Sequence, residues 1–423
     1  MSPVFGAVAD DLTGGLELAA MIRAGGMPCA FVTELPDSVS DPAIVVARRT
    51  RVAEPDLAVA DISRVGAWLI QRGARQLFFK YCATFDSTPQ GNIGNCADAL
   101  RQLTGSRLAA FCPSFPEAGR RVFQGHLFAD DRLISESPKR YDPLTPMTDP
   151  DLVRVLQQQT ATPVGLIPQQ IVRAGLEAMT QHCERLIADG IGFALGDAAV
   201  PEDLAALAAL TVDWPLMTGN SSIAAYYPAL WCERGLVNPT VDVPLLPPVS
   251  GPGVVLAGSC AEKTRRQLEV FAQHRPVLML DLAAVGDADA AVTEALDWAL
   301  PRLADGPVAI ATSADPDAVA AVQTKLGQRR AASLAEEVLS KLAYALRAVG
   351  VRRFLIAGGE TSGAVLDRLA IRSLRVGAYR APGVSQALSE GATPLAFCLK
   401  SGKLGPEDML LPMLASMEKG EQP

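Results

Sequence analysis

Short apolar runs alternate along the chain with longer amphipathic segments. In the first part of the chain the apolar runs predict strands at 5–9, 29–33, 43–47, 76–80 and 107–112. Between them, the pattern predicts helices over 16–24, 57–71 and 95–103. Because the strands are apolar throughout and alternate with helices, they are expected to form a parallel sheet with helices on both faces.

The rhythm stops at residues 113–150, which are rich in proline, glycine and short polar turns and predict a long loop. It then resumes. Strands are expected at 163–167, 191–195, 253–257, 276–280, 307–312, 353–357 and 394–399. Helices are expected over 149–158, 169–187, 201–210, 261–273, 288–304, 315–325, 331–349 and 406–418.

One proline-rich segment divides the pattern. Residues 237–252 (VNPTVDVPLLPPVSGP) contain five prolines, which neither a helix nor a central strand accepts. We therefore predict an α/β protein of two domains, 1–236 and 253–423, joined by a linker over 237–252. Each domain is expected to be a mostly parallel sheet flanked by helices, with the active site in the cleft between the domains.

Composition excludes several classes of protein. The chain has 423 residues, 49% of them hydrophobic, and a net charge of −8, which argues against a nucleic-acid partner or an anionic membrane surface. The sequence contains no run of 18 apolar residues, so no membrane span is expected, and the start of the chain lacks the basic region of a signal peptide. The eight cysteines form no CxxC pair, and only three histidines are present, so we expect reduced thiols in a cytoplasmic protein and no metal site of the zinc type.

Charged residues follow the predicted strands of the first domain. Asp10 and Asp11 come directly after strand 5–9, and one helix cap explains only one of the two acids. Arg51 ends a cluster of three arginines (ARRTR) after strand 43–47, where its fork suits a carboxylate or phosphate. The alternatives are a plain helix cap and a solvated charged turn.

The segment FFKYCATFDSTPQGNIG at 78–94 is the richest in candidate side chains. Lys80 ends a strand, and Asp86, Ser87 and Thr88 precede a glycine-rich helix start. This combination suits a polyhydroxy anion, with a plain loop as the alternative. It lacks the spacing of a P-loop.

Glycine turns follow three predicted strands of the second domain. The three turns are LAGSCAEKT, which contains Ser259, LKSGKLG, which contains Gly402, and IAGGETSGAVL. In the last of these, two adjacent glycines let the backbone approach a phosphate. The run comprises Gly358, Gly359, Glu360, Thr361 and Ser362.

Together these segments resemble the four-carbon acid sugar kinase family over nearly the whole chain and in the family's order. The matching motifs are ADDLTG at 9–14, KYCATFDSTPQGNIG at 80–94, CPSFPEAGRRVFQGHLF at 112–128, PLTPMTDPDLVRVLQQQT at 143–160, AGSC at 257–260, GGETSGAV at 358–365 and LKSGKLG at 399–405. The TFDST form and the long PLTPMTD segment resemble the branch that acts on 3-oxo-tetronates. The chain departs from the family pattern at Glu17, where the family has an aspartate.

The resemblance implies a sugar-acid-binding N-terminal domain and an ATP-binding C-terminal domain, with transfer of the γ-phosphoryl group to the 4-hydroxyl of a four-carbon keto acid. By position, it assigns substrate binding to Asp10, Arg51, Lys80, Ser87 and Thr88, and catalysis to Asp11 or Asp86. ATP binding falls to Ser259, Gly358, Gly359, Glu360, Thr361, Ser362 and Gly402, with Mg²⁺ as a second cofactor.

Three alternatives stay open. A D-threonate or D-erythronate kinase of the same family would share these motifs. A nicotinamide-dependent oxidoreductase would also have two α/β domains, but no predicted strand is followed by GxGxxG. A non-catalytic sugar-acid sensor would fit the same cleft. The expected partners are a sugar acid and ATP, and a homodimer is allowed for.

Overall fold

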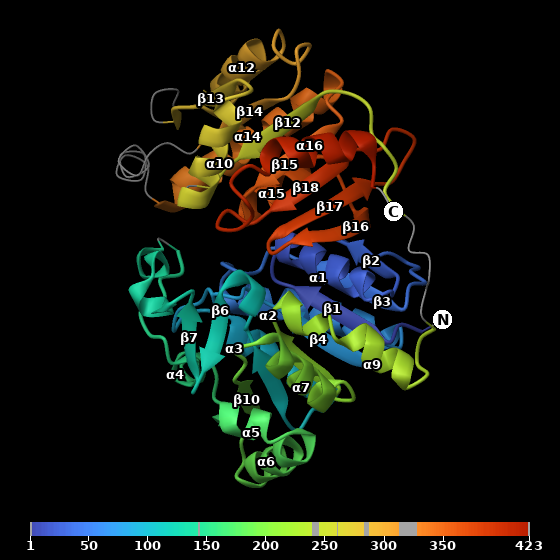
Figure 1. Cartoon of the computed structure of the whole chain (residues 1–423), viewed down its shortest axis with the longest axis vertical. Coiled ribbons are helices and arrows are strands. Elements are labelled where there is room, and N and C mark those ends of the chain that lie inside the picture. The colour runs from blue at the N-terminus through green and yellow to red at the C-terminus, as the bar shows by residue number, and fades with distance from the viewer. Residues whose placement is uncertain are drawn as a thin grey trace. The chain divides into compact units, whose positions relative to one another are not determined.

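The structure is a computed structural model that describes residues 2–142, 144–238, 245–259, 261–282, 287–312 and 328–421. The chain forms two compact units, residues 1–243 and 244–423, which Figure 1 draws from blue to red along the sequence. The expected helix over 315–325 and most of the first half of the expected linker, residues 239–244, lie outside the described residues. So do Pro143 and Cys260 of two motifs.

The first unit contains a parallel sheet in the order β2-β3-β1-β4-β11-β5-β10-β9. Its strands are β1 (Phe5–Ala9), β2 (Cys29–Val32), β3 (Ala43–Ala47), β4 (Gln76–Lys80), β5 (Ala109–Cys112), β9 (Val164–Ile167), β10 (Phe193–Gly196) and β11 (Leu216–Gly219). The central strands β1, β3, β4, β5, β10 and β11 are buried along their whole length. The expected parallel sheet is thereby confirmed for this unit.

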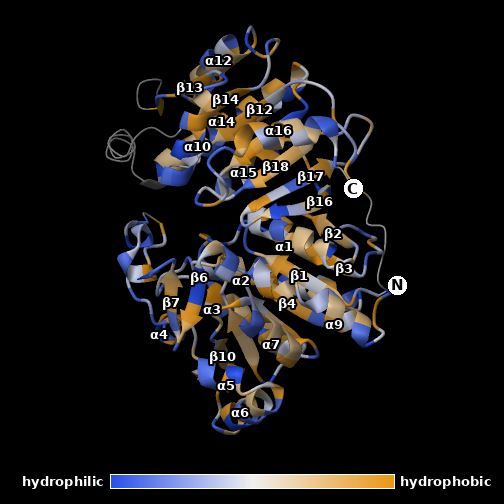
Figure 2. Cartoon of the chain, viewed as in Figure 1, coloured by the Kyte–Doolittle hydropathy of each residue, from blue (hydrophilic) through white to orange (hydrophobic). Residues whose placement is uncertain are grey.

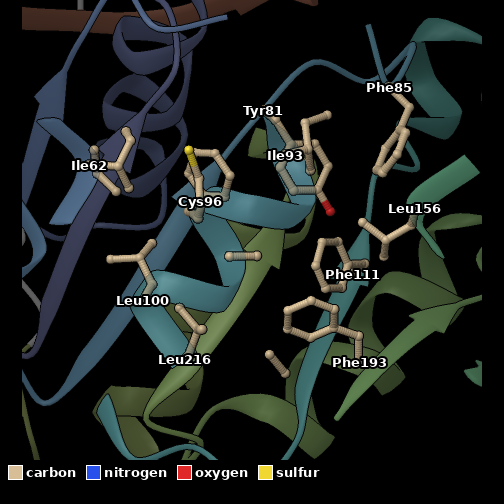
Figure 3. Close-up of a cluster of buried hydrophobic side chains, with 14 of the residues drawn as sticks. Ile62, Tyr81, Phe85, Ile93, Cys96, Leu100, Phe111, Leu156, Phe193 and Leu216 are labelled. Carbon is tan, nitrogen blue, oxygen red and sulfur yellow. The ribbon is translucent and has the colours of Figure 1, made fainter. Parts of the chain in front are cut away.

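Helices cover both faces of this sheet. They are α1 (Leu12–Ala24), α2 (Pro55–Gln71), α3 (Ile93–Thr104), α4 (Leu152–Gln157), α5 (Gln169–Arg173), α6 (Leu176–Ala188), α7 (Pro201–Thr211), α8 (Ser221–Ala224) and α9 (Tyr227–Glu233). On one face α2 and α3 pack in a large core, part of which Figure 3 shows around Ile62, Leu100 and Phe111. On the other face, Phe5 and Phe78 meet the stacked rings of Tyr227 and Trp231 in α9.

The segment expected to be a long loop instead contains a small antiparallel sheet. Its strands are β6 (Arg120–Phe123), β7 (His126–Ala129) and β8 (Arg132–Leu133), followed by short 3-10 helices at Ile134–Glu136 and Pro138–Tyr141. The two residues between β6 and β7, Gln124 and Gly125, have φ of +50° and +74°, which suits a tight hairpin turn. The strands are too short, and the turns too close, for the pattern of apolar residues to reveal them.

The second unit has a mostly parallel sheet in the order β13-β14-β12-β15-β18-β17-β16. Its strands are β12 (Gly253–Ala257), β13 (Val277–Met279), β14 (Val308–Ala311), β15 (Arg353–Ala357), β16 (Ser373–Ala381), β17 (Val384–Ser389) and β18 (Ala396–Lys400). Strands β16, β17 and β18 pair antiparallel, and the others pair parallel. Figure 2 shows strands of both units mainly in the hydrophobic colour, whereas α10 carries much hydrophilic colour.

The described helices of the second unit are α10 (Glu262–Ala272), α12 (Ala288–Ala299), α14 (Gln328–Ala348), α15 (Gly359–Arg368) and α16 (Leu410–Lys419). A core of Leu268 and Phe271 from α10, and Leu410 and Leu414 from α16, packs on one face of the sheet. Among the described residues no helix has both the length and the apolar character needed to cross a membrane.

Other elements also differ from the expectations. The single helix expected over 169–187 is two helices, because Gly175 between them has φ of +96° and breaks the helical backbone. Strands β11, β16 and β17 were not expected. In β17 the buried residues include Ser385 and Gln386, so its sequence lacks an apolar run.

Asp197 holds the β6–β7 hairpin to the larger sheet. Its fully buried carboxylate accepts hydrogen bonds from the backbone N–H groups of Gln124, Gly125 and Gln169 at 2.7, 2.9 and 2.9 Å. Asp197→Ala leaves these donors unsatisfied, so the free energy of unfolding should fall by about 2–4 kcal/mol in urea titrations. Asp197→Asn keeps one acceptor oxygen and should lose less. Equal stability of all three proteins would contradict this role.

Candidate functional site

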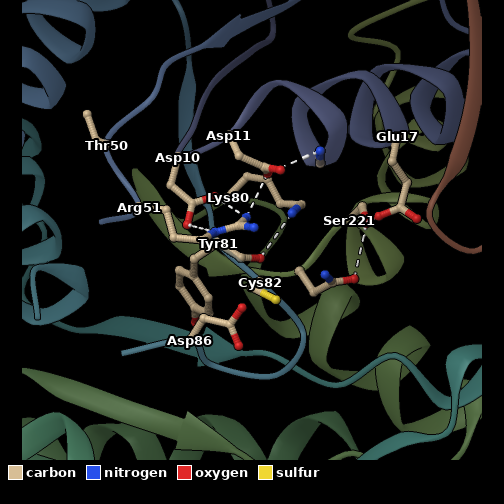
Figure 4. A network of polar contacts seen from close by, with 12 residues as sticks. Asp10, Asp11, Glu17, Thr50, Arg51, Lys80, Tyr81, Cys82, Asp86 and Ser221 are labelled. Carbon is tan, nitrogen blue, oxygen red and sulfur yellow. Dashed lines mark hydrogen bonds and ion pairs between the residues drawn. The ribbon is translucent and has the colours of Figure 1, made fainter. Parts of the chain in front are cut away.

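The strand register of the first unit brings the chain's charged turns together. Ala9 of β1 is in register with Ala47 of β3 and with Lys80 of β4, and Lys80 is in register with Gly219 of β11. The strands run parallel, so the residues that follow each strand emerge at the same edge of the sheet. Figure 4 shows the resulting network of polar side chains.

Asp10, Asp11 and Arg51 form one ion-paired group at this edge. Arg51 donates from Nε and Nη2 to the two oxygens of Asp10 at 2.9 and 2.7 Å, and from Nη2 to Asp11 Oδ1 at 2.6 Å. Asp11 also caps α1, because its Oδ1 accepts from the N–H of Gly14 at 3.1 Å. Asp11 is therefore the helix cap that the sequence allowed for, and Asp10 is the second acid, which the cap does not explain. No acceptor among the described residues bonds Arg51 Nη1.

Lys80 completes the group. It is 2% exposed and donates to the carbonyl of Tyr81 at 3.1 Å. A Cβ on Gly14 would lie 2.3 Å from Lys80 Nζ and 2.5 Å from Asp11 Oδ1, so only glycine lets these two charged groups approach the start of α1. Two buried carboxylates, the buried Lys80 and the half-buried Arg51 thus form one small cluster.

Burial and charge act against each other on these groups. Burial raises the pKa of Asp10, and the Arg51 guanidinium works against that rise. Burial lowers the pKa of Arg51, but Asp10 and Asp11 outweigh it and hold that pKa well above its ordinary value. Arg51 therefore stays charged, and its charge opposes the rise in the pKa of Asp10.

Asp86 lies next to this cluster in the 81–88 loop (Figure 4). Both Asp86 and Arg51 act on Cys82, which lies between them. Burial and Asp86 raise the pKa of its thiol, and Arg51 works against the rise. Asp86 follows Phe85, whose φ of +49° is unusual for a residue other than glycine. Phe85 is fully buried against Tyr81 with ring centroids 5.3 Å apart, and this packing maintains the strained turn that orients Asp86.

Lys139 is a residue of this region that the sequence analysis missed. Its Nζ is 2.7 Å from Asp86 Oδ1, and it donates to Asp142 and Thr145 at 2.8 Å each. The hydroxyl of Thr84 donates to the same Asp86 oxygen. Lys139 is 6% exposed and so fixes Asp86 to the 137–147 segment. The sequence offered one indication of its role: Lys139 lies just before the PLTPMTD segment, which the motif comparison had already identified.

Ser87 and Thr88 are held by Gln159, which the sequence analysis also missed. Gln159 Nε2 donates to Ser87 Oγ at 2.6 Å and to the Thr88 carbonyl at 2.7 Å, and its Oε1 accepts from Gly94 at 2.9 Å. A Cβ on Gly91 would lie 1.9 Å from Ser87 Oγ, which explains the glycine there. These contacts give the 87–94 loop one shape at the start of α3.

Two further residues have structural partners. Arg48, in the arginine cluster, pairs with Asp61 of α2 at 2.6 Å and donates to the carbonyl of Thr33 at 2.5 Å. With Arg51 also paired to acids, much of the positive charge of the arginine cluster ARRTR is neutralised. Glu17 is 4% exposed on α1 and accepts a hydrogen bond from Ser221 Oγ.

In the second unit the predicted glycine turns also meet at one edge. Ala257 of β12, Ala357 of β15 and Lys400 of β18 lie in register across three parallel strands. The N–H of Gly258 donates to the Ala357 carbonyl at 3.1 Å, and that of Gly358 donates to the Lys400 carbonyl at 3.0 Å. The three turns that follow these strands are therefore neighbours, as the sequence pattern suggested.

Close approaches between these turns explain their glycines. A Cβ on Gly258 would lie 2.2 Å from Thr361 Oγ1, and one on Gly402 would lie 1.9 Å from Ser259 Oγ. Gly358 has φ of +126° and precedes α15, which begins at Gly359. The structure thus brings together the residues assigned to ATP, namely Ser259, Gly358, Gly359, Glu360, Thr361, Ser362 and Gly402.

The donors at this edge suit a polyphosphate. The first backbone N–H groups of the ten-residue helix α15 have no partner within the helix, and such groups bind anions. The small hydroxyl side chains of Ser259 and Thr361 lie beside them. Within the described ranges no three or more His, Cys, Asp or Glu side chains form a metal-binding group.

Comparison with known proteins agrees with a charged ligand site in the first unit and an anion site in the second. A family model described as a sugar-binding N-terminal domain matches residues 5–227, and one described as a nucleotide-binding C-terminal domain matches residues 254–410. A 3-oxo-tetronate kinase of Pseudomonas fluorescens is 41% identical over 99% of this chain and 98% of its own length. The chain belongs to the 3-oxo-tetronate kinase family of four-carbon acid sugar kinases.

Other members and solved structures are similar over the same extent. A 3-oxo-tetronate kinase of Cupriavidus necator is 43% identical, covering 96% of this chain and 95% of its own. A solved protein of Salmonella typhimurium matches with a TM-score of 0.83 at 32% identity, covering 98% of this chain and 99% of its own. One of Haemophilus influenzae matches with a TM-score of 0.72, also at 32% identity, covering 98% and 100%. The resemblance inferred from the motifs is confirmed, and it leaves no support for the oxidoreductase alternative.

The two crowded glycines predict separable defects in a kinase of this family. Gly14→Ala should displace Lys80 and Asp11, and so raise the KM of the sugar acid or lower kcat, by about tenfold or more. The KM of ATP should change little. Gly402→Ala should push on Ser259 and raise the KM of ATP instead. Steady-state kinetics on both variants test the assignment, and a change in the same constant for both would contradict it.

Proposed function

We propose that this protein is an ATP-dependent kinase that transfers the γ-phosphoryl group to the 4-hydroxyl of a 3-oxo-tetronate, giving the 4-phosphate for sugar-acid breakdown. The observation that carries the proposal is the full-length similarity to proteins named 3-oxo-tetronate kinase, at 41% and 43% identity. The charged cluster of the first unit and the glycine turns of the second supply the chemistry that such a transfer requires.

Recognition of the acid falls to the cations of the first unit. Lys80 is available to the keto oxygen or carboxylate, and Arg51 offers the donors of Nη1 while its other nitrogens stay with Asp10 and Asp11. Both oxygens of Asp10 lie in the fork of Arg51, so its contribution to substrate binding is to hold that guanidinium in place. The hydroxyls of Ser87 and Thr88 are proposed to contact hydroxyl groups of the substrate.

Two carboxylates compete for the role of base. Asp11 is bound through Oδ1 to Gly14 and Arg51, and Asp86 is bound through Oδ1 to Lys139 and Thr84. Each is thus oriented by a cation and a neutral donor, and each would accept or orient the proton of the 4-hydroxyl as it attacks the phosphorus. The geometry is symmetrical enough that kinetics must decide between them.

The nucleotide is proposed to lie on the three glycine turns of the second unit. Backbone N–H groups at the start of α15, with Ser259, Thr361 and Gly402, would bind phosphate oxygens. Mg²⁺ bound with the nucleotide would supply positive charge that offsets the charge developing during transfer. Since Mg²⁺ is commonly held by phosphates, waters and one or two carboxylates, the absence of a three-ligand group among the described residues is compatible with it.

Several finer statements are part of the same proposal. The transfer requires the two ligands to come into contact, and a cleft between the domains would allow this. The cleft stays a prediction, as do the domain boundaries at 236 and 253. A cytoplasmic location rests on the cysteines, which among the described residues are free thiols. A homodimer also stays a prediction.

One assay separates the proposed activity from its alternatives. Purified full-length protein with Mg·ATP should release ADP with a 3-oxo-tetronate at a kcat/KM at least about tenfold above that with D-threonate or D-erythronate. A preference for D-threonate or D-erythronate would place the chain in the other activity of the family. Binding of a four-carbon acid without ADP release would instead indicate a sensor.

The choice of base is tested by a matched pair of variants, Asp86→Asn and Asp11→Asn. Asparagine keeps the shape of either side chain and removes its charge, so loss of the base should lower kcat by about 10²–10⁴-fold. We expect the variant of the base to keep its ATP affinity and its melting temperature. A kcat within threefold of wild type excludes Asp86, or Asp11, from the role.

A further inference from the structure

Lys400 is a fully buried lysine at the edge of the second unit's sheet. It is the last residue of β18 and is 0% exposed. Its Nζ donates to the carbonyl of Ser401 at 2.7 Å and to Thr264 Oγ1 at 3.0 Å, and Thr264 Oγ1 donates in turn to the carbonyl of Gly402 at 2.7 Å. Lys400 therefore connects the turn at 401–402 with the first turns of α10.

No acid compensates this cation. Within the part of the chain that the structure describes, no carboxylate oxygen lies within 4 Å of Lys400 Nζ, and its two acceptors are neutral oxygens. A buried charge is costly unless it is paired, and such side chains either lose their charge or meet an ion of opposite sign. Lys400 therefore lacks the opposite charge that a buried structural lysine would need to stay protonated.

The position of Lys400 indicates which anion completes it. The turn that it holds contains Gly402, which lies against Ser259, and Gly358 donates to the carbonyl of Lys400 itself. The 401–402 turn and Gly358 therefore adjoin Lys400 directly, and Ser259 is next to it through Gly402. A polyphosphate at these turns would be the nearest strong anion.

We propose that Lys400 is the cationic centre of the nucleotide site: it positions the 401–402 turn, and it takes up a proton when the phosphates bind. This inference rests on the proposed nucleotide role of the glycine turns. It assigns Lys400 as a positioning residue whose charge is supplied on binding, so nucleotide affinity depends on pH.

The groups around Lys400 support a charge that changes near neutral pH. Burial lowers the pKa of Lys400 to about 7, Cys398 on the same strand works against this, and Lys263 on α10 lowers the pKa further. Lys263 itself pairs with Glu407 at 3.2 Å. Glu360 opens α15 in the neighbouring turn, and Arg380 of β16 acts on Cys398. An arriving polyphosphate would raise the pKa of Lys400 and so favour its protonated form.

Calorimetry of full-length protein with Mg·ADP, in buffers of different ionisation enthalpy, measures this proton directly. With a pKa near 7 in the free protein and well above 9 in the complex, binding should take up about 0.9 proton at pH 8 and about 0.1 at pH 6. For the same reason the Kd should rise about tenfold from pH 8 to pH 9.

Two variants separate charge from shape. Lys400→Arg keeps a permanent positive charge, so it should bind Mg·ADP with little proton uptake and a flat Kd between pH 7 and 9. Lys400→Met keeps the length of the side chain without the charge, and should bind at least about tenfold more weakly at pH 7, again without proton uptake. If either variant fails to fold, the proton count of the wild type still decides.

The outcomes distinguish this inference from the proposed function. Tight nucleotide binding by the wild type without proton uptake at pH 8 overturns the role of Lys400 and leaves the kinase proposal intact. Unchanged proton uptake in Lys400→Met does the same. Absence of nucleotide binding by the wild type overturns both. Uptake near one proton at pH 8 that disappears in Lys400→Arg supports the inference.

Discussion

Parallel pairing of short buried strands is the constraint on which both sites depend. In the first unit Ala9, Lys80, Gly219 and Cys112 stand in one row across four strands, and in the second unit Ala257, Ala357 and Lys400 stand in another. Each row ends the regular hydrogen bonding of the sheet. The backbone groups and side chains that follow it are released at one edge, where turns from distant parts of the sequence become neighbours. A slip in register would separate these turns before it exposed much of the core.

The charged cluster of the first unit is maintained by mutual neutralisation. Asp10 and Asp11 are 3% and 5% exposed and are bound by one guanidinium, so removal of Arg51 would leave two buried carboxylates without their main partner. Asp86 depends in the same way on Lys139. The site therefore has two acid groups, each fixed by a cation that comes from elsewhere in the sequence. Such fixation keeps the carboxylates oriented before any substrate arrives.

Sequence reasoning succeeded where burial on both faces leaves an unbroken apolar run, so the bounds of β1, β3, β4, β12 and β15 were predicted to the residue. It failed at β17, where buried Ser385 and Gln386 interrupt the run, and at the short strands of the β6–β7 hairpin. The candidate residues that follow strands were singled out, and the structure brings them to one edge of each sheet. Lys139 and Gln159 were missed because they reach the 81–94 loop from segments more than fifty residues away, and pairing at that distance has no local pattern. Lys400 was missed because the glycine turn beside it carried the recognisable motif.

A buried lysine ends a strand at the site-bearing edge of each unit. Lys80 and Lys400 each end a buried strand that pairs parallel with at least one neighbour, and each donates to the carbonyl of the residue that follows. Lys80 has the carboxylate of Asp11 close by across Gly14, and its charge lowers the pKa of Asp10, whereas Lys400 has only neutral acceptors. A small acid with a single charge needs orientation more than neutralisation, and a nearly balanced cluster gives that. A polyphosphate brings several charges, so on the proposed assignment the uncompensated lysine of the second unit would gain most from a bound nucleotide. The protein carries a net charge of −8, so this attraction has to be local.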